Sequence, residues 1–194
     1  MSQFSVKKIC QGILWLFIVA VFFSCKSKKS NDPADDVVTS WIGKTIKFPK
    51  NAQCSVLGEY TPCKFSVVKP YKILLYTDST GCTSCKLRID EWKNLIKEAD
   101  TTMHGKVDFF FYFYPKNDGF IYDLMKRENF RDQVYIDNRD ELNRLNNLPK
   151  TMDYQCFLLD RNNKVLLVGN PTFNSNVWKV EKDIISGKIK MNMN

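Results

Sequence analysis

The stretch that decides the fold runs from residue 72 to residue 99 and reads KILLYTDSTGCTSCKLRIDEWKNLIKEA. Its first part, Lys72 to Thr77, is a short apolar run typical of a buried strand. Cys82 and Cys85 follow at CxxC spacing. From Cys82 to Ala99, apolar residues recur mostly every three or four positions, which predicts an amphipathic helix. The sequence therefore places two cysteines where a buried strand gives way to a helix.

This position favours reactive thiol chemistry. A thiolate at a helix N-terminus is stabilised by unpaired backbone N–H groups and by the positive end of the helix dipole. Both favour the charged form, so we expect the pKa of Cys82 to lie below the free value of about 8.5. Cys85 lies one helical turn later, close enough to attack a mixed disulfide formed at Cys82. The spacing predicts Cys82 as the nucleophile and Cys85 as the resolving thiol of thiol–disulfide exchange.

Strands and helices alternate through the rest of the chain. Residues 106–114 (KVDFFFYFY) are almost continuously apolar and aromatic, as expected of a central strand covered on both faces. Further elements are expected as helices near 119–129, 139–147 and 176–186 and as strands near 133–136, 154–159 and 165–168. The last two strands flank a polar turn, which predicts a hairpin. The order indicates an α/β fold with a central mixed β-sheet flanked by helices.

The strand, the CxxC motif, the helix, the aromatic strand and the final hairpin together resemble the thioredoxin superfamily, specifically its TlpA-like extracytoplasmic lipoproteins. The resemblance covers roughly residues 70–187, and the hairpin matches at CFLLD (156–160), NKV (163–165) and Gly169. It implies a thioredoxin-like domain over 71–190 that works outside the cytoplasm as a disulfide reductase, isomerase or oxidase. It further implies partners among exported protein thiols and disulfides, a redox partner protein, and no bound cofactor.

Two features around the motif depart from the family pattern. Gly81 precedes the first cysteine, where the family usually has tryptophan. The family also places a cis-proline, facing the CxxC motif, at the start of the penultimate strand. Counting back from Asp160 puts Tyr154 at that place, with Asp153 before it and Pro149 several residues earlier. By this correspondence, Gly81, Asp153 and Tyr154 are expected to face the substrate.

The first 24 residues are expected to be an export signal. Lys7 and Lys8 precede an apolar run at 13–23 (ILWLFIVAVFF), which is shorter than the roughly 20 residues of a membrane-spanning helix. The sequence FFSC at 22–25 resembles a bacterial lipobox, which implies a lipid on Cys25. We therefore expect a chain anchored by lipid on the periplasmic side of a bacterial membrane. An ordinary cleaved signal and an uncleaved anchor are the alternatives.

Two segments separate this signal from the domain. Residues 26–36 (KSKKSNDPADD) are polar and without periodicity, so residues 25–40 are expected to form a lipidated flexible tether. Residues 41–70 form an N-terminal extension without a clear periodic pattern, in which edge strands are expected at 46–48 and 65–68.

Composition limits the classes of function. The chain has 194 residues, of which 44% are hydrophobic and 26% charged, and this excludes a disordered or collagen-like protein. Lys and Arg exceed Asp and Glu by 29 − 21 = 8. These charges are mixed along the chain and no nucleic-acid-binding motif occurs, so we expect no nucleic-acid partner.

The other cysteines have different expected roles. Cys10 leaves with the signal and Cys25 takes the lipid. Cys54 and Cys63 can close a small loop as a structural disulfide, although the sequence alone does not establish the bond. Cys156 lies in an apolar strand pattern typical of a buried and unreactive thiol.

Alternatives to redox chemistry are a metal site and a purely structural role. A zinc site built from Cys54, Cys63, Cys82 and Cys85 is disfavoured because its first pair lies nine residues apart, outside the usual spacing. A copper site would require a histidine ligand. The single histidine of the sequence, His104, lies in a polar stretch typical of a solvated loop. We therefore expect no metal ligands. A structural disulfide at the CxxC motif, within a non-catalytic binding or assembly module, is the main alternative.

Overall fold

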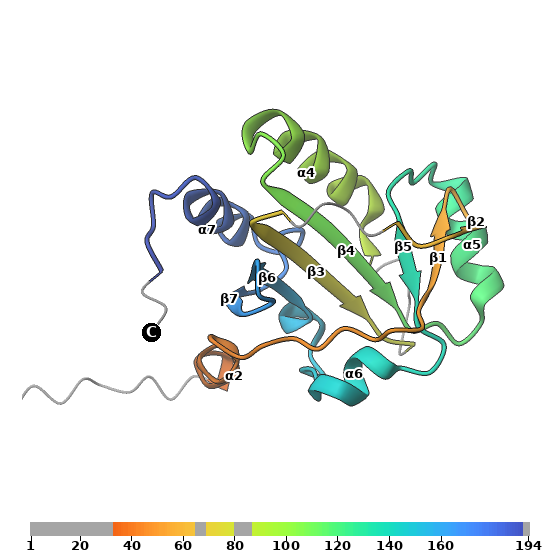
Figure 1. Ribbon diagram of the computed structural model, residues 1–194, viewed down its shortest axis with the longest axis horizontal. Helices are drawn as coiled ribbons and strands as arrows, with labels where there is room; N and C mark the ends of the chain where they lie inside the picture. The colour runs from red at the N-terminus through yellow and green to blue at the C-terminus, as the bar shows by residue number, and fades with distance from the viewer. Residues whose placement is uncertain (1–32, 65–68, 80–86, 192–194) are drawn as a thin grey trace, which may run out of the picture. The chain divides into compact units, whose positions relative to one another are not determined.

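The computed structural model describes residues 33–64, 69–79 and 87–191, and the described residues from 36 onward belong to one compact unit (Figure 1). The strands are β1 (Gln53–Val56), β2 (Glu59–Thr61), β3 (Tyr71–Thr77), β4 (Val107–Phe113), β5 (Val134–Ile136), β6 (Cys156–Asp160) and β7 (Val165–Val168). The helices are α2 (Pro33–Trp41), α4 (Ile89–Thr102), α5 (Asp118–Arg127), α6 (Glu141–Asn146), α7 (Ser175–Ile185) and the 3₁₀ helix η1 (Met152–Tyr154). Among the described helices, none has the length and apolar character needed to cross a membrane.

The described strands form one sheet in the order β2-β1-β5-β4-β3-β6-β7. The three inner strands β3, β4 and β5 are parallel, whereas β1 and β6 run antiparallel to them. The final strands β6 and β7 form the predicted antiparallel hairpin. The predicted α/β fold with a mixed sheet is therefore confirmed.

The aromatic strand β4 lies at the centre of this sheet, as predicted. Its neighbours are β3 on one side and β5 on the other. Phe111 belongs to the apolar cluster on one face of the sheet, and Tyr112 belongs to the cluster on the other face. Both faces of the strand are covered, which explains its nearly continuous apolar sequence.

Helices cover the two faces unequally. The first face packs against α4, α5 and α7 through a cluster that contains Trp92, Leu124 and Ile184. The second face packs against α6 and the end of α2 through a cluster that contains Leu142 and Trp41. Helices α5, α6 and α7 overlap the predicted ranges.

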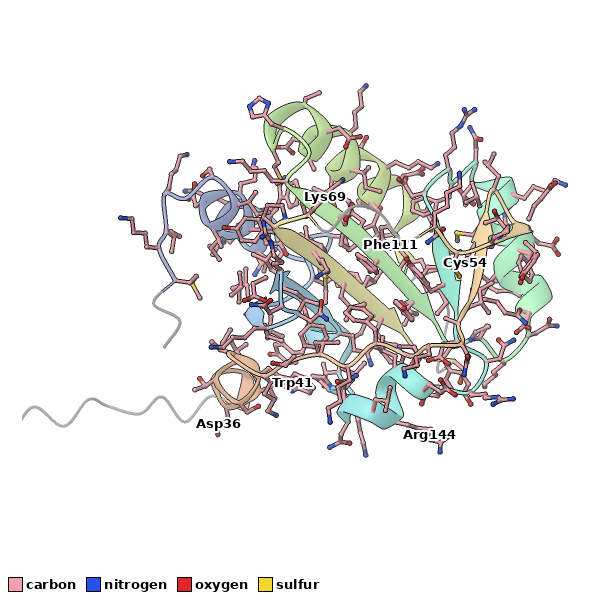
Figure 2. All side chains as sticks on the ribbon, in the orientation of Figure 1. Asp36, Trp41, Cys54, Lys69, Phe111 and Arg144 are labelled. Carbon is pink, nitrogen blue, oxygen red and sulfur yellow. A yellow bond between two sulfur atoms is a disulfide. The ribbon has the colours of Figure 1, made fainter. Side chains whose placement is uncertain are left out.

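The N-terminal extension adds two strands that the sequence analysis did not predict. β1 pairs with the edge of β5 and with β2, and the turn between β1 and β2 is formed by Leu57 and Gly58, both at positive φ. A disulfide joins Cys54 to Cys63, with their Cα atoms 5.1 Å apart (Figure 2). The bond that the sequence left open is therefore present, and the extension contributes β1 and β2 to the sheet.

The edge strand predicted at 46–48 is wrong, whereas the one predicted at 65–68 lies outside the described residues. Only Thr45 makes a single bridge, to Lys164, and the chain then leaves the sheet. Ile46 is 1% exposed because it packs into the second core cluster rather than against a neighbouring strand. The apolar pattern at 46–48 reflects burial in the core rather than pairing in the sheet.

Part of the predicted tether is helical. Residues 33–40 belong to α2, which ends at Trp41. The Trp41 ring packs on Phe157 of β6 with the ring centroids 5.2 Å apart, and Lys44 lies over the same ring (Figure 2). This contact ties the end of α2 to the second face of the sheet.

Candidate functional site

The inner parallel strands end together at one edge of the sheet. The backbone N–H of Tyr114 donates to the carbonyl of Thr77 at 2.9 Å, and that of Asp137 donates to the carbonyl of Phe113 at 2.8 Å. The arrowheads of β3, β4 and β5 accordingly point to the same edge, which we call the carboxyl edge (Figure 1). Ligands of open α/β sheets bind outside this kind of edge.

The chain segment that contains the CxxC motif begins at the carboxyl edge. β3 ends at Thr77, and the described chain resumes at Leu87, a fully buried residue of the first core cluster. Gly81, Cys82 and Cys85 lie outside the described residues. The segment that contains the motif is thus flanked in the chain by two well-packed elements, β3 and α4.

The predicted single helix from Cys82 to Ala99 is interrupted. Arg88 adopts a left-handed conformation with φ of 41°, and α4 begins only at Ile89 and continues to Thr102. Such a conformation disfavours continuation of a helix through a non-glycine residue. Hydrophobic periodicity continues across the break, so it did not reveal the interruption.

Arg88 makes several contacts in this conformation. Its guanidinium pairs with Glu91 at 2.8 Å, donates to the carbonyl oxygen of Thr172 and lies 5.3 Å from the centroid of the Phe173 ring. The N-terminus of α4 is therefore attached to the loop that follows β7. This attachment holds the end of the CxxC-containing segment next to a second loop of the molecule.

Asp153 and Tyr154 also lie at the carboxyl edge. They belong to η1 rather than to the predicted strand, which begins at Cys156. The backbone N–H of Tyr76 donates to the carbonyl of Gln155 at 2.9 Å, so η1 lies beside the end of β3. Asp153 is exposed and Tyr154 is half-buried, and no cis peptide bond occurs among the described residues.

A hydrogen bond ties the end of β3 to the start of α6. The Tyr76 hydroxyl donates to a carboxylate oxygen of Asp140 at 2.5 Å. Burial and this hydrogen bond raise the pKa of Tyr76 well above its ordinary value, so the phenol stays protonated. The contact fixes the position of α6 relative to the strand that precedes the CxxC motif.

A buried carboxyl group on α7 was missed by the sequence analysis. Glu181 is fully buried, and neither of its carboxyl oxygens has a hydrogen-bond partner among the described residues. Burial raises the pKa of Glu181 well above its ordinary value. The signal was available, because Glu181 lies three residues from Trp178 and three from Ile184 on the buried stripe of the helix.

Cys156 is the one free cysteine among the described residues, and it is fully buried. Burial, together with the Glu181 carboxyl, raises the pKa of this thiol well above its ordinary value. The expected burial of this thiol is confirmed. Cys156 therefore serves as an internal reference against which the CxxC thiols can be compared.

We expect the buried acid to make stability depend on pH. Because the pKa of Glu181 is raised on folding, the folded state holds the proton more tightly than the unfolded state. The free energy of unfolding therefore falls as pH rises above the unfolded pKa of about 4.3. The difference in the free energy of unfolding between wild type and Glu181→Gln should change by up to about 1.4 kcal/mol per pH unit above that value.

Urea denaturation over a range of pH values measures this difference. Glu59→Gln is the matched control, because the Glu59 side chain is 75% exposed. Its neutralisation should leave the pH dependence of the free energy of unfolding the same as in wild type. Parallel pH profiles for wild type and Glu181→Gln would show that the buried carboxyl has an ordinary pKa.

The structure places some of the residues named in the metal alternatives. The zinc site that used Cys54 and Cys63 is wrong, because both sulfurs are in a disulfide. His104 is exposed in the turn after α4. Within residues 33–64, 69–79 and 87–191, no three histidine, cysteine or acidic side chains gather as a metal site would require.

Comparison with solved structures identifies the fold. The chain is similar to a Chlorobium tepidum protein assigned as the thiol:disulfide interchange protein DsbE, with 17% identity, a TM-score of 0.50 and coverage of 75% of this chain and 97% of that one. It is also similar to an uncharacterized thioredoxin-like protein from Porphyromonas gingivalis (11% identity, TM-score 0.52, 78% and 99% coverage). A mutant of PrxQ from Xylella fastidiosa is a further neighbour (11% identity, TM-score 0.54, 76% and 97% coverage).

These likenesses confirm the predicted thioredoxin-like fold. No family model matches the sequence, and no curated protein matches it. At such identities, the structural neighbours establish the arrangement of the sheet and helices. Activity has to be inferred from the residues of this chain.

Proposed function

We propose that the protein is a thiol–disulfide oxidoreductase that acts on exported proteins through Cys82 and Cys85. The observation that favours it most is the place of the motif in the chain, between the carboxyl end of an inner parallel strand and α4 of a thioredoxin-like sheet. Neighbouring segments converge on this edge, as η1 and the start of α6 are both hydrogen-bonded to the end of β3. Cofactors are not required for this chemistry.

In the reducing direction, the Cys82 thiolate attacks one sulfur of the substrate disulfide. A bond forms between that sulfur and Cys82, and the other substrate sulfur leaves as a thiolate and takes a proton. Cys85 then loses its proton and attacks the Cys82 sulfur, which releases the second substrate thiol and leaves a Cys82–Cys85 disulfide. The substrate gains two electrons and the pair loses two, so a reduced dithiol of a redox partner protein must restore the pair.

The main alternative is a non-catalytic module in which the same two cysteines form a structural bridge. The reduction potential of the Cys82–Cys85 pair distinguishes the oxidoreductase from the non-catalytic module. We expect a value above about −300 mV, because structural disulfides of exported proteins lie below it. The measurement equilibrates the full chain in dithiothreitol buffers and quantifies the alkylated peptide by mass spectrometry. The Cys54–Cys63 disulfide in the same chain is an internal structural control.

We also propose that a lipid on Cys25 anchors the chain on the periplasmic side of a bacterial membrane. In cells fed labelled palmitate, the wild-type chain should take up label and Cys25→Ala should not. Cys10→Ala is the matched control and should be labelled like wild type, since Cys10 belongs to the expected signal. Equal labelling of Cys25→Ala and wild type would contradict the anchor.

A further inference from the structure

A cavity of about 540 Å³ lies between α6 and the chain segment that leads into β1. Lys47, Lys50 and Arg144 line it together with the apolar side chains of Phe48 and Leu145. The segment is fixed to the helix, because Asn146 accepts from the backbone N–H of residue 47 and donates to its carbonyl, both at 2.8 Å. The cavity therefore has walls held in place by the fold.

This cavity extends toward the carboxyl edge. An adjoining cavity of about 340 Å³ shares Asn51 and Glu141 with it and is lined by Asp137 and Asn138, the residues that directly follow β5. We call the two cavities together the α6 groove. Its edge-side end lies two strands from the end of β3, which corresponds to roughly 10 Å. An extended chain spans that distance in about three residues.

Three basic side chains that line the larger cavity have no ion-pair partner among the described residues, and the acidic side chains of the groove are Glu141 and Asp137. Lys47, Lys50 and Arg144 form no ion pair with any residue in the described parts of the chain, and Glu141 is the only acidic side chain that lines the larger cavity. Arg144 projects outward from α6 (Figure 2). Leu145 beside it is 47% exposed, so an apolar surface adjoins the free cations.

A second basic cavity, between the ends of α4 and α7, has an internal explanation. Its Lys182 pairs with Glu98 at 2.6 Å and its Lys188 pairs with Asp183 at 3.3 Å. Cations at helix C-termini also complement the helix dipole. The α6 groove differs because three cations there have no such partners and belong mostly to a non-helical segment.

We propose that the α6 groove binds an extended, acidic segment of the substrate protein, adjacent to the disulfide that the CxxC motif attacks. Carboxylates of the segment pair with Lys47, Lys50 and Arg144, while an apolar side chain of the segment packs on Phe48 and Leu145. This inference rests on the proposed function, whose substrates it narrows to proteins with acidic and apolar residues near the target cysteine.

The test compares two triple variants of the full chain, purified in a nonionic detergent. Lys47→Ala/Lys50→Ala/Arg144→Ala removes the groove cations, whereas Lys97→Ala/Lys179→Ala/Arg161→Ala removes the same charges at exposed positions elsewhere. Fluorescence anisotropy measures binding of a labelled peptide of alternating Asp and Leu. We expect the groove variant to bind about tenfold more weakly than wild type, and the control variant to bind like wild type. A peptide with Lys in place of Asp should not bind.

Other outcomes would overturn the proposal. Equal loss of binding in both triple variants would mean that the peptide responds only to net charge. Binding of anionic vesicles by wild type, lost in the groove variant while peptide binding is unchanged, would assign the groove to the membrane surface. Reduction of the uncharged bis(2-hydroxyethyl) disulfide is measured in parallel. If wild type does not reduce this small disulfide, the proposed function is refuted. The anisotropy measurement tests independently whether the α6 groove binds an acidic peptide.

Discussion

The Cys82→Ser variant is expected to lose reduction of a protein disulfide by at least about three orders of magnitude, because a serine hydroxyl is not ionised and cannot replace the attacking thiolate. Cys85→Ser is expected to behave differently. It retains the nucleophile but lacks the resolving thiol, so a mixed disulfide with the substrate should accumulate. Turnover is followed with a fluorogenic protein disulfide, and the adduct by non-reducing electrophoresis.

The control for these variants is Cys156→Ala. Its thiol is fully buried, so its removal should leave turnover close to that of wild type. Wild-type turnover in both Cys82→Ser and Cys85→Ser would refute the enzyme proposal. Adduct formation on Cys82→Ser rather than on Cys85→Ser would reverse the assigned roles.

Phe111→Ala is expected to have the largest effect on stability, a loss of about 3–5 kcal/mol in the free energy of unfolding. Phe111 is 2% exposed at the centre of the sheet and makes edge-to-face contacts with Trp92 of α4 and with Phe130, at centroid distances of 5.3 and 5.1 Å (Figure 2). Truncation removes these contacts and leaves a cavity between β4 and the helix that follows the CxxC motif.

Urea denaturation followed by tryptophan fluorescence measures this loss. Phe120→Ala is the matched control, since Phe120 is 43% exposed on α5, and it should change the free energy of unfolding by no more than about 0.5 kcal/mol. Similar losses in the two variants would contradict the central position assigned to β4.

The strongest hydrophobic patterns in the sequence predicted the centre of the fold. The apolar run of β4 and the hairpin of β6 and β7 required no information beyond hydrophobic pattern and turn residues. The short strands β1 and β2 have no such pattern, because they lie at the edge of the sheet and expose part of their side chains. Their pairing depends on contacts with β5 and on the tight turn at Leu57 and Gly58.

The turn at Gly58 shows why such local structure was not predictable. A Cβ atom at this position would lie 2.1 Å from the carbonyl oxygen of Tyr122, so glycine is required by a neighbour from α5. Likewise, the break at Arg88 depends on contacts with Thr172 and Phe173, more than eighty residues away. Hydrophobic periodicity contains no information about such partners.

The candidate site was predicted in part. The sequence predicts a role for Cys82 and Cys85, which lie outside the described residues, and it places Asp153 and Tyr154 near the carboxyl edge, where η1 lies beside β3. It did not reveal the buried Glu181 or the cations of the α6 groove. These depend on which helix faces point inward and on a segment whose path is set by hydrogen bonds to α6.

The most direct test of the redox proposal is the rate at which Cys82 is alkylated as a function of pH. The Cys85→Ser chain is treated with iodoacetamide, and the peptide containing residue 82 is quantified by mass spectrometry. We predict a half-maximal rate at a pH clearly below about 8.5, the value for a free cysteine. A midpoint at or above that value, or alkylation that begins only when the chain unfolds, would contradict an activated thiolate at Cys82.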